Sequence, residues 1–355
     1  MTTEADALRL ALDLAWRGWG RVQPNPLVGA VVLRNGEVVG TGWHPAFGQM
    51  HAEAMALREA GERSRGGTLV VTLEPCRHEG KQPPCTALIR RAGINRVVIG
   101  AGDPNPLASG GAAELAAVGI EVELLPLDLE VRRQNPAFFR VFTAPELPFT
   151  ALKLATSVDG AIADQGSQSR WISGREAREY VHWLRAGFDA LAVGGRTARH
   201  DDPALTVRGA VAPRVPPRRV IFSRSGDLTG AVMLQGTARE LPVTVIGQGI
   251  PERRRHALTE AGIEVLPVDP REGLRTLRRR GVLSVLVEGG GELASRLIDA
   301  GLIDRFYWIQ SPLWLGIGGV PAFGGLRGNP LADAERWHVV ERRPLGEDTL
   351  LVLER

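Results

Sequence analysis

The sequence predicts an α/β protein made of two layered α/β domains, and three observations carry this prediction. The chain has 355 residues, more than a single hydrophobic core usually organises. Apolar, strand-like segments alternate with helix-like segments, which is typical of a mainly parallel sheet covered by helices. The alternation occurs twice, with a break near residue 148. We therefore expect one domain at residues 1–147 and another at residues 148–355.

The first half begins with a helix and a hairpin. Residues 8–19 carry apolar side chains at helical spacing, and residues 27–43 form two strand-like runs around Asn35-Gly36, a favoured hairpin turn. Helix and strand then alternate as far as residue 126. The helices are expected at 51–61, 85–93 and 111–119, and the strands at 67–75, 95–106 (with its loop) and 120–126. Residues 127–148 are interpreted as the junction between the domains.

The second half repeats the α/β pattern. Its strands precede glycine turns, and the helical segment 292–301 follows one of these turns. The strands are expected within 149–160, 189–195, 218–226, 242–247, 284–291 and 305–316. Two arginine-rich runs, residues 251–258 and 274–281, fit helices with solvated polar faces. The proline-rich residues 211–219 predict a surface loop.

Composition excludes several classes of protein. The net charge is +3, and the arginines are scattered along the chain, which argues against a nucleic-acid partner. No run of eighteen apolar residues is present, so we expect no membrane partner. Two cysteines are too few for a disulfide scaffold, and the first twenty residues do not have the order of a signal peptide. We expect a cytoplasmic protein.

Three residues of the first half predict a metal site: His51, Cys76 and Cys85. Zinc accepts thiolate and imidazole ligands in a tetrahedron, and three protein ligands leave the fourth position for water, as in catalytic sites. Cys85 begins a predicted helix after two prolines, where the unpaired backbone donors favour a thiolate. Burial of the two cysteines in one loop, without a metal, is the alternative.

Glu53 follows His51 by two residues, about 200° around a helix, so both can face one metal only from the first turn. A carboxylate there can move a proton between water and a departing amine, as in zinc deaminases. Eight residues separate Cys76 from Cys85, so this loop must bulge outward, and it carries Lys81. Lys81 and Lys153 are the only lysines among 43 basic residues.

Eight blocks of the sequence resemble the bifunctional riboflavin-biosynthesis deaminase/reductase family. Four blocks resemble the deaminase half of that family: NPLVGAVV, GWHPAFGQMHAEAMAL, VTLEPCRHEGKQPPC and GDPNPLASGG. Four others resemble the reductase half: KLATSVDGAIA, SRWIS, RTARHDDPALTVR and VEGGGELASRLIDAGLIDRF. The resemblance implies a cytidine-deaminase-like domain fused to a dihydrofolate-reductase-like domain. The first would replace the 2-amino group of 2,5-diamino-6-ribosylamino-4(3H)-pyrimidinone 5′-phosphate by oxygen. The second would reduce the ribosyl group of the product to ribityl with NADPH.

The resemblance also implies roles for residues of the first half. His51, Cys76 and Cys85 would hold Zn²⁺, and Glu53 would carry the proton. The phosphorylated pyrimidine would be contacted by Asn25, His44, Lys81 and Asn105. The asparagines offer donors and acceptors that suit a pyrimidine edge, although alone either is an ordinary turn residue. Lys81 would meet the ribose phosphate as a point charge.

In the second half, the resemblance implies a cofactor site and a sugar-phosphate site. NADPH would be contacted by Thr156, Trp171, Thr197, Asp201, Ser223, Gly289, Gly290 and Gly291. The substrate would be contacted by Ser169, Arg185, Leu205, Arg208 and Glu288. The three glycines lie between a strand and a helix, where backbone donors can receive a phosphate, or they form an ordinary close-packed connection. No GxGxxG motif is present.

Lys153 lies in the first strand of the second half, in the same segment as Asp159. It is interpreted as a proton donor to the reacting sugar, with a structural ion pair as the alternative. The chain departs from the family at Trp314 and Phe222, where a lysine and an acidic residue are common.

Two other functions stay open at this point. One is a zinc deaminase of a nucleoside or a tRNA base with an accessory domain. The other is a zinc-stabilised RNA-binding protein, which predicts a fourth protein ligand and steep salt dependence of RNA affinity. Fused sequential enzymes often self-associate, so a homo-oligomer is one expectation.

Overall fold

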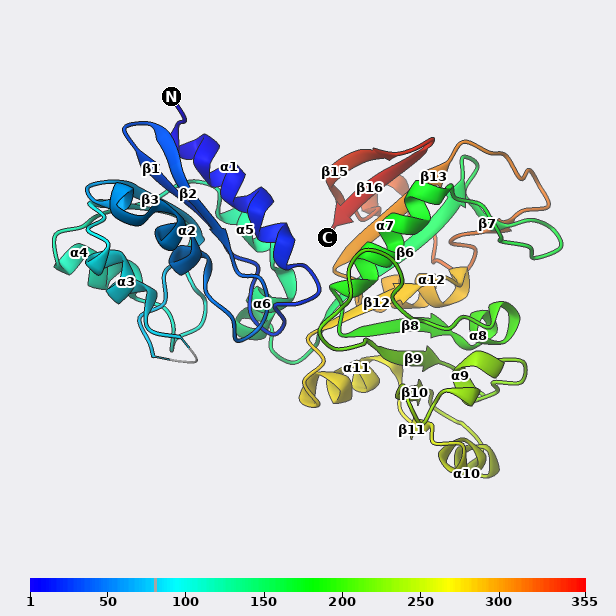
Figure 1. Ribbon diagram of the computed structural model, residues 1–355. Coiled ribbons are helices and arrows are strands. Elements are labelled where there is room, and N and C mark those ends of the chain that lie inside the picture. The colour runs from blue at the N-terminus through cyan, green and yellow to red at the C-terminus, as the bar shows by residue number, and fades with distance from the viewer. Residues whose placement is uncertain (80–81) are drawn as a thin grey trace. The chain divides into compact units, whose positions relative to one another are not determined.

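The structure is a computed structural model that describes residues 1–79 and 82–355. It divides into two compact units, Met1–Pro145 and Glu146–Arg355 (Figure 1). Glu146 and Leu147, expected in the first domain, are thus grouped with the second unit. Each unit has its own large sheet. No helix in the described residues is long and apolar enough to cross a membrane.

The first unit is built on a five-stranded sheet with the order β2-β1-β3-β4-β5. Its strands are β1 (Gly29–Arg34), β2 (Glu37–Trp43), β3 (Thr68–Leu73), β4 (Arg96–Ala101) and β5 (Glu121–Leu124). The expected hairpin forms, because Asn35 and Gly36 adopt the positive φ angles of 54° and 76° that a tight turn requires. Strands β3, β4 and β5 run parallel, as the helix-strand alternation predicts.

Helices cover both faces of this sheet (Figure 1). Successive side chains of a strand point to opposite faces, so Val31, Val70 and Val98 pack against α1, whereas Val32, Val71 and Val97 pack against the α2 side. The helices are α1 (Glu4–Ala15), α2 (Ala52–Ala60), α3 (Cys85–Arg91) and α4 (Gly111–Ala117), with short 3-10 turns at Trp16–Gly18 and Gly61–Ser64. Helices α2, α3 and α4 share one core with the sheet, and α1 shares another.

Residues 127–148 are more than a junction, which corrects the expectation from the sequence. They form α5 (Asp128–Gln134) and α6 (Pro136–Thr143). Val131 and Phe139 from these helices are buried beside β3 and β4. The Asn135 side chain binds both backbone groups of Leu27, accepting from its N–H at 2.7 Å and donating to its carbonyl at 3.0 Å. Residues 128–143 are therefore an integral part of the first unit.

The second unit is built on a nine-stranded sheet with the order β11-β10-β9-β8-β12-β6-β13-β16-β15. The first seven strands in this order are parallel, and β16 and β15 are antiparallel to their neighbours. The parallel strands are β6 (Phe149–Ser157), β8 (Ala190–Gly194), β9 (Arg218–Phe222), β10 (Val243–Ile246), β11 (Glu264–Leu266), β12 (Ser284–Glu288) and β13 (Arg305–Ser311). They are nearly continuous apolar runs, as expected where a sheet is buried on both faces.

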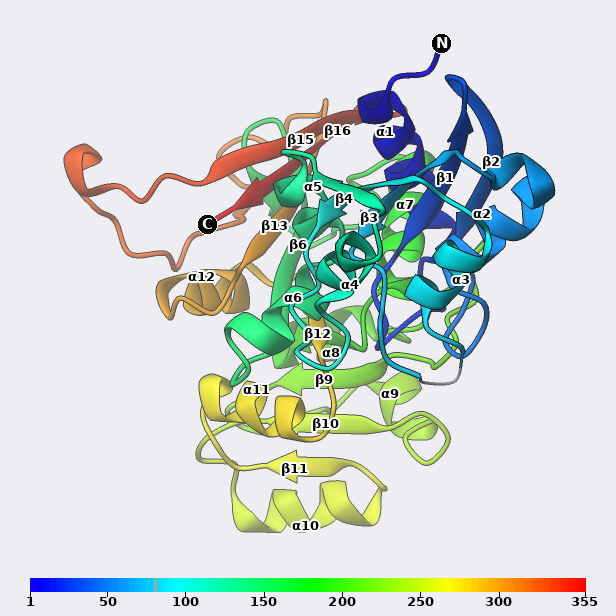
Figure 2. The same cartoon turned by 90° about the vertical axis from the view of Figure 1, so that its left-hand side faces the viewer.

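Helices α11 (Pro270–Arg279) and α12 (Gly291–Asp299) share the main core with the parallel strands. Figure 2 displays β9, β10 and β11 one below another, with α10 (Glu252–Glu260) beyond β11. The remaining helices are α7 (Arg175–Ala186), α8 (Gly195–Asp201) and α9 (Val232–Gly236), and residues 331–333 form a 3-10 turn. The two arginine-rich runs lie in α10 and α11, and the proline-rich residues 211–217 form a loop before β9.

Several elements of the second unit were not predicted from the sequence, and two pairs of strands are examples. The C-terminal hairpin of β15 (His338–Leu345) and β16 (Asp348–Glu354) extends the sheet, and β7 (Ala161–Ala163) pairs with β14 (Val320–Pro321) in a small sheet. Most of β15 is exposed, so it lacks the apolar alternation that reveals a strand. Helix α7 packs beside β15, where Arg343 lies 4.8 Å from the Tyr180 ring centre.

Candidate metal centre and second-unit cavity

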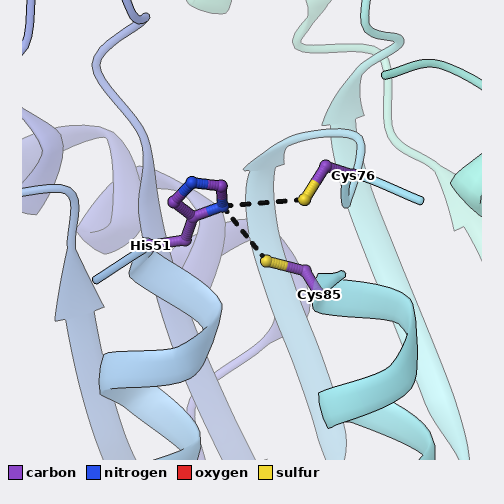
Figure 3. Close-up of side chains that lie close together, drawn as sticks. All are labelled: His51, Cys76 and Cys85. Atoms are coloured by element: carbon purple, nitrogen blue, oxygen red, sulfur yellow. Dashed lines mark hydrogen bonds between the residues drawn. The ribbon is translucent and has the colours of Figure 1, made fainter. Parts of the chain in front are cut away.

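His51, Cys76 and Cys85 converge at the carboxyl end of β3 (Figure 3). His51 directly precedes the first turn of α2, Cys76 lies in the loop after β3, and Cys85 is the first residue of α3. His51 Nδ1 lies 3.6 Å from Cys76 Sγ and 3.3 Å from Cys85 Sγ. The three side chains thus come from separate elements that meet at one point.

This arrangement fits zinc. Tetrahedral zinc, with Zn–S of about 2.3 Å and Zn–N of about 2.0 Å, sets neighbouring ligand atoms about 3.6 Å apart. The measured separations are close to this value, and all three ligand atoms lie within 4.8 Å of one another. The described residues contribute three ligands to this group, so a tetrahedral ion would keep one open position.

The cysteines and His51 form one hydrogen-bonded group. The hydrogen bond from the Cys85 thiol is the main cause that lowers the pKa of Cys76, to about 4, and the bond to His51 acts in the same direction. The same bond raises the pKa of Cys85, because that thiol is the donor. The hydrogen bond to Cys76 raises the pKa of His51. Anionic sulfur, the form that binds metal, is therefore favoured at Cys76.

Glu53 lies in the first turn of α2 and is only 4% exposed. Burial is the largest cause acting on its carboxyl group and raises its pKa, while the charge of His51 and a hydrogen bond with Cys85 lower it. The first helical turn thus brings His51 and Glu53 to the same site. A buried carboxyl group that is not one of the three ligands lies beside them.

Asn25 and His44 form a pair next to the metal ligands. Asn25 Nδ2 lies 3.2 Å from His44 Nε2, and His44 Nδ1 lies 3.1 Å from the Met50 carbonyl oxygen. A carbonyl only accepts, so Nδ1 carries the proton and Nε2 accepts from Asn25. Burial lowers the pKa of His44, which keeps the ring neutral. Its ring stands edge-on to His51, with centres 5.4 Å apart.

Asn105 lies in the loop after β4, near the cysteines. Its side-chain oxygen accepts from the Leu107 N–H at 3.1 Å, and its backbone N–H donates to Asp103 at 2.8 Å. Ala108 from the same loop packs with Cys76 and Cys85. The remaining predicted substrate residue of this half, Lys81, lies outside the described residues.

Sequence reasoning missed Glu74. Its carboxylate accepts three backbone hydrogen bonds, from Asp103 at 3.1 Å, Gly110 at 3.0 Å and Ala112 at 2.9 Å. Glu74 therefore fastens both ends of the loop that carries Asn105 to the end of β3. An acidic residue directly after a buried strand and before Pro75-Cys76 was the available signal.

The second unit contains a cavity of about 1980 Å³ at the carboxyl ends of its parallel strands, the usual ligand position in such sheets. Its walls carry ten Lys and Arg side chains against five Asp and Glu, so the cavity favours anions. Thirteen predicted residues line it: Lys153, Ser169, Trp171, Arg185, Thr197, Asp201, Leu205, Arg208, Ser223, Glu288, Gly289, Gly290 and Gly291.

Two of these residues, Arg185 and Glu288, form an ion pair. Arg185 and Glu288 join through two parallel bonds, Nε to Oε1 at 2.5 Å and Nη2 to Oε2 at 2.8 Å. Glu288 stands opposite Lys153 in the register of β12 and β6. Burial lowers the pKa of Lys153, the charges of Glu288 and Asp348 raise it, and Arg185 lowers it.

Two residues of the β6 segment have other partners than the cavity or Lys153. The alternative of an ion pair between Lys153 and Asp159 does not form, because the Asp159 carboxylate accepts from the backbone N–H groups of Leu315 and Gly316. Thr156 is not among the described residues that line the cavity: it is buried, and its hydroxyl accepts from the Trp308 indole at 2.9 Å. Its contact with NADPH stays a prediction.

The cavity fits an anionic dinucleotide. Gly289 and Gly290 adopt φ angles of 79° and 80°, and a Cβ atom at Gly290 would lie 3.0 Å from the Thr197 hydroxyl. Glycine here keeps the backbone accessible between β12 and α12. Trp171 is 69% exposed at the cavity wall, and the Arg178 guanidinium lies 4.6 Å from its ring centre. Phe222, one of the family departures, also lines the cavity.

His182 on α7 also lines the cavity and was missed by sequence reasoning. It precedes Arg185 by three residues, so both lie on one helix face. This spacing is a usable signal only if residues 175–186 are known to form a helix, as they do in α7.

Comparisons with known proteins agree with both halves. A family model for the RibD C-terminal domain matches residues 148–351, and one for the cytidine and deoxycytidylate deaminase zinc-binding region matches residues 1–101. The riboflavin biosynthesis protein RibD of Aquifex aeolicus is 38% identical over 352 residues, covering 98% of this chain and 97% of the relative. The RibD protein of Escherichia coli is 36% identical over 370 residues, covering 97% of each.

Solved structures agree as well. Acinetobacter baumannii RibD matches with a TM-score of 0.83 and 34% identity over 99% of this chain and 98% of that one. A deaminase/reductase from Thermotoga maritima matches with a TM-score of 0.83 and 36% identity, with the same coverage. The expected fold class and the family resemblance are confirmed. The chain belongs to the RibD family and is a bifunctional enzyme of riboflavin biosynthesis, with a zinc-binding deaminase domain and a reductase domain of the NADPH-binding type.

Proposed function

We propose that the first unit deaminates diaminohydroxyphosphoribosylaminopyrimidine, and that the second reduces 5-amino-6-(5-phosphoribosylamino)uracil with NADPH. These are the compounds in the description of the Thermotoga maritima relative, which is 36% identical over 99% of this chain. The observation that carries the proposal is the convergence of His51, Cys76 and Cys85 beside the buried Glu53. Three zinc ligands and a neighbouring carboxylate are the parts that hydrolytic deamination needs.

In the deaminase step, His51, Cys76 and Cys85 would hold zinc, which supplies Lewis-acid activation of water when bound. The water oxygen bonds to the pyrimidine carbon, the carbon–nitrogen bond breaks, and ammonia leaves. Glu53 takes a proton from the water and passes it to the departing amine. Asn25 and Asn105 orient the pyrimidine, His44 supports Asn25 through their hydrogen bond, and Lys81 keeps its predicted role at the phosphate.

In the reductase step, the residues of the cavity would hold NADPH, which when bound would supply a hydride for the ribosyl carbon that bears the amine. The ring oxygen that leaves this carbon needs a proton. Lys153 is the proposed donor because it lines the cavity opposite Glu288. We assign Ser169 and Leu205 to the substrate, and to the cofactor Trp171, Thr197, Asp201, Ser223 and the glycines 289–291, all of which line the cavity.

The contacts of Arg185 suggest different roles for Arg185 and Arg208, the two arginines predicted to bind the phosphate. Arg185 uses Nε and Nη2 on Glu288, and its Nη1 donates to the Thr206 carbonyl at 3.1 Å. Arg208 is exposed at the cavity wall. We assign the sugar phosphate to the Arg208 guanidinium, with Arg185 and Glu288 forming the floor of the site.

A cytoplasmic location also belongs to the proposal. Cys76 and Cys85 are free thiols, and a reducing compartment keeps thiol ligands available for metal. The absence of a nucleic-acid partner and assembly into a homo-oligomer stay predictions. Salt-dependent RNA binding would contradict the first, and sedimentation measures the second.

A direct assay tests the proposal. Purified protein is analysed for zinc and incubated with the diaminopyrimidine ribosyl phosphate, with and without NADPH. We expect ammonia release in both cases and NADPH oxidation after deamination. Turnover of cytidine or adenosine, with none of the diaminopyrimidine, would overturn the assigned substrate and favour a nucleoside deaminase.

A further inference from the structure

His182 holds the backbone of the residue that we assign to the sugar phosphate. The imidazole Nδ1 accepts a hydrogen bond from the Arg208 N–H at 3.2 Å. An Nδ1 that accepts leaves the ring proton on Nε2, so the contact needs a neutral ring. His182 lies on α7, and Arg208 lies in the loop between α8 and β9. The bond therefore ties a loop to a helix.

Arg185 ties the same loop at a second point, two residues away. Its Nη1 donates to the Thr206 carbonyl and lies 3.5 Å from His182 Nδ1. Leu205 adopts a φ of 48°, which disfavours a branched side chain, and its side chain is buried. A loop with such a residue needs external contacts to keep one conformation. His182 and Arg185 supply them from one face of α7.

The charges around His182 keep its ring in the accepting form. The pKa of His182 is lowered to about 4, mainly by burial and next by the positive charges of Arg185 and Arg208. Glu288 acts in the opposite direction, and Lys153 adds a smaller lowering effect. At neutral pH the His182 ring is uncharged, so it does not compete with the arginines for the substrate phosphate.

We propose that His182 is a positioning residue of the reductase site, which fixes the Arg208 backbone so that the Arg208 guanidinium meets the substrate 5′-phosphate. The inference rests on the proposed reductase function and on the assignment of Arg208. A positioning role for His182 differs from a general packing role, because its loss should weaken binding only of a substrate that carries the phosphate. A loosened Arg208 costs binding only when a phosphate is there to be bound.

The test compares kcat/KM for 5-amino-6-(5-phosphoribosylamino)uracil with that for the same compound without its phosphate, using saturating NADPH. For His182→Ala, we expect this ratio to fall about tenfold, with KM for NADPH and ammonia release within twofold of the starting protein. His182→Asn keeps an acceptor near the Nδ1 position and should restore most of the ratio. His256→Ala, on the exposed face of α10, is the matched control.

A double-mutant cycle makes the test sharper. If His182 acts through Arg208, then adding His182→Ala to Arg208→Ala lowers the ratio no further. A further tenfold fall in that background would overturn the proposal, as would equal losses with both substrates. His182→Leu, of similar volume but without an acceptor, covers the case in which the alanine variant does not fold. Lack of any NADPH-dependent turnover in the starting protein would overturn the proposed function instead.

Discussion

Glu53 combines burial with a position beside three metal ligands, and this combination defines its chemistry. Its place in the first turn of α2 follows from His51, which precedes the helix as its N-cap residue. His51 has an extended backbone with φ −72° and ψ 160°, so the rotation of about 100° per residue inside a helix does not turn it away from Glu53. Moving either residue by one position would separate the carboxyl group from the ligands.

Glu53→Gln tests the proton path. We expect ammonia release to fall by a factor of about 100 or more, with zinc content and the thermal unfolding midpoint little changed, because glutamine keeps the shape but cannot take up a proton. Coupled ammonia detection and metal analysis are the measurements. Glu62→Gln, an exposed residue just beyond α2, is the control. Turnover near the normal rate would remove Glu53 from the proton path.

The lowered pKa of His182 predicts that the stability of the protein depends on pH. Its pKa is about 4 in the native protein against 6.5 as the reference, so between these values the unfolded chain binds a proton that the native state does not. The free energy of unfolding therefore falls as the pH drops through this window. His182→Asn should lose less stability between about pH 7 and about pH 4, as measured by urea unfolding. Parallel curves for the two proteins would contradict this assignment.

At the scale of elements, the loop after β4 depends on one carboxylate. Glu74 accepts from Asp103 at the start of the loop and from Gly110 and Ala112 where α4 begins. These bonds hold Asn105 and Ala108 against the cysteine side of the site. Support of this kind fixes the geometry of residues that contact a substrate.

Glu74→Ala should destabilise the first unit by about 2–4 kcal/mol, because three partly buried N–H groups lose a charged acceptor. Glu74→Gln, which keeps one oxygen, should cost less. Denaturant unfolding followed by circular dichroism measures the change, and kcat/KM for ammonia release should fall in the same order. Glu130→Ala, an exposed residue of α5, is the control. An effect of Glu74→Ala no larger than that of the control would show that the loop does not need this contact.

At the scale of the whole molecule, the two chemistries use separate units. The three metal ligands and Glu53 lie within Met1–Pro145, and the residues that line the basic cavity lie within Glu146–Arg355. Each unit has its own sheet and core. Loss of the metal is therefore a local event in the first unit.

Complete chelation should abolish ammonia release and leave NADPH oxidation intact when the deaminated uracil compound is supplied directly. Zinc readdition should restore the first activity. The two rates are measured on one sample, so the reductase rate reports that the protein is still folded. Equal loss of both activities would contradict the division of labour between the units.

The two α/β domains and the three residues proposed as metal ligands were predictable from local patterns in the sequence. Periodicity and turn residues are local properties, which is why the hairpin at Asn35-Gly36 and the helix that begins at Cys85 were predictable. The spacing of His51 and Glu53 restricted both to a first helical turn for the same reason.

The contacts between side chains that are distant in the sequence became known only from the three-dimensional structure. It turned Thr156 toward Trp308, gave Asp159 a backbone partner in place of Lys153, and built α5 and α6 into the first unit. It also joined Glu74 and His182 to loops 29–38 and 26 residues away along the chain. Such contacts depend on strand register, on the face of the pleat and on loop closure, and none of these is a property of a short segment.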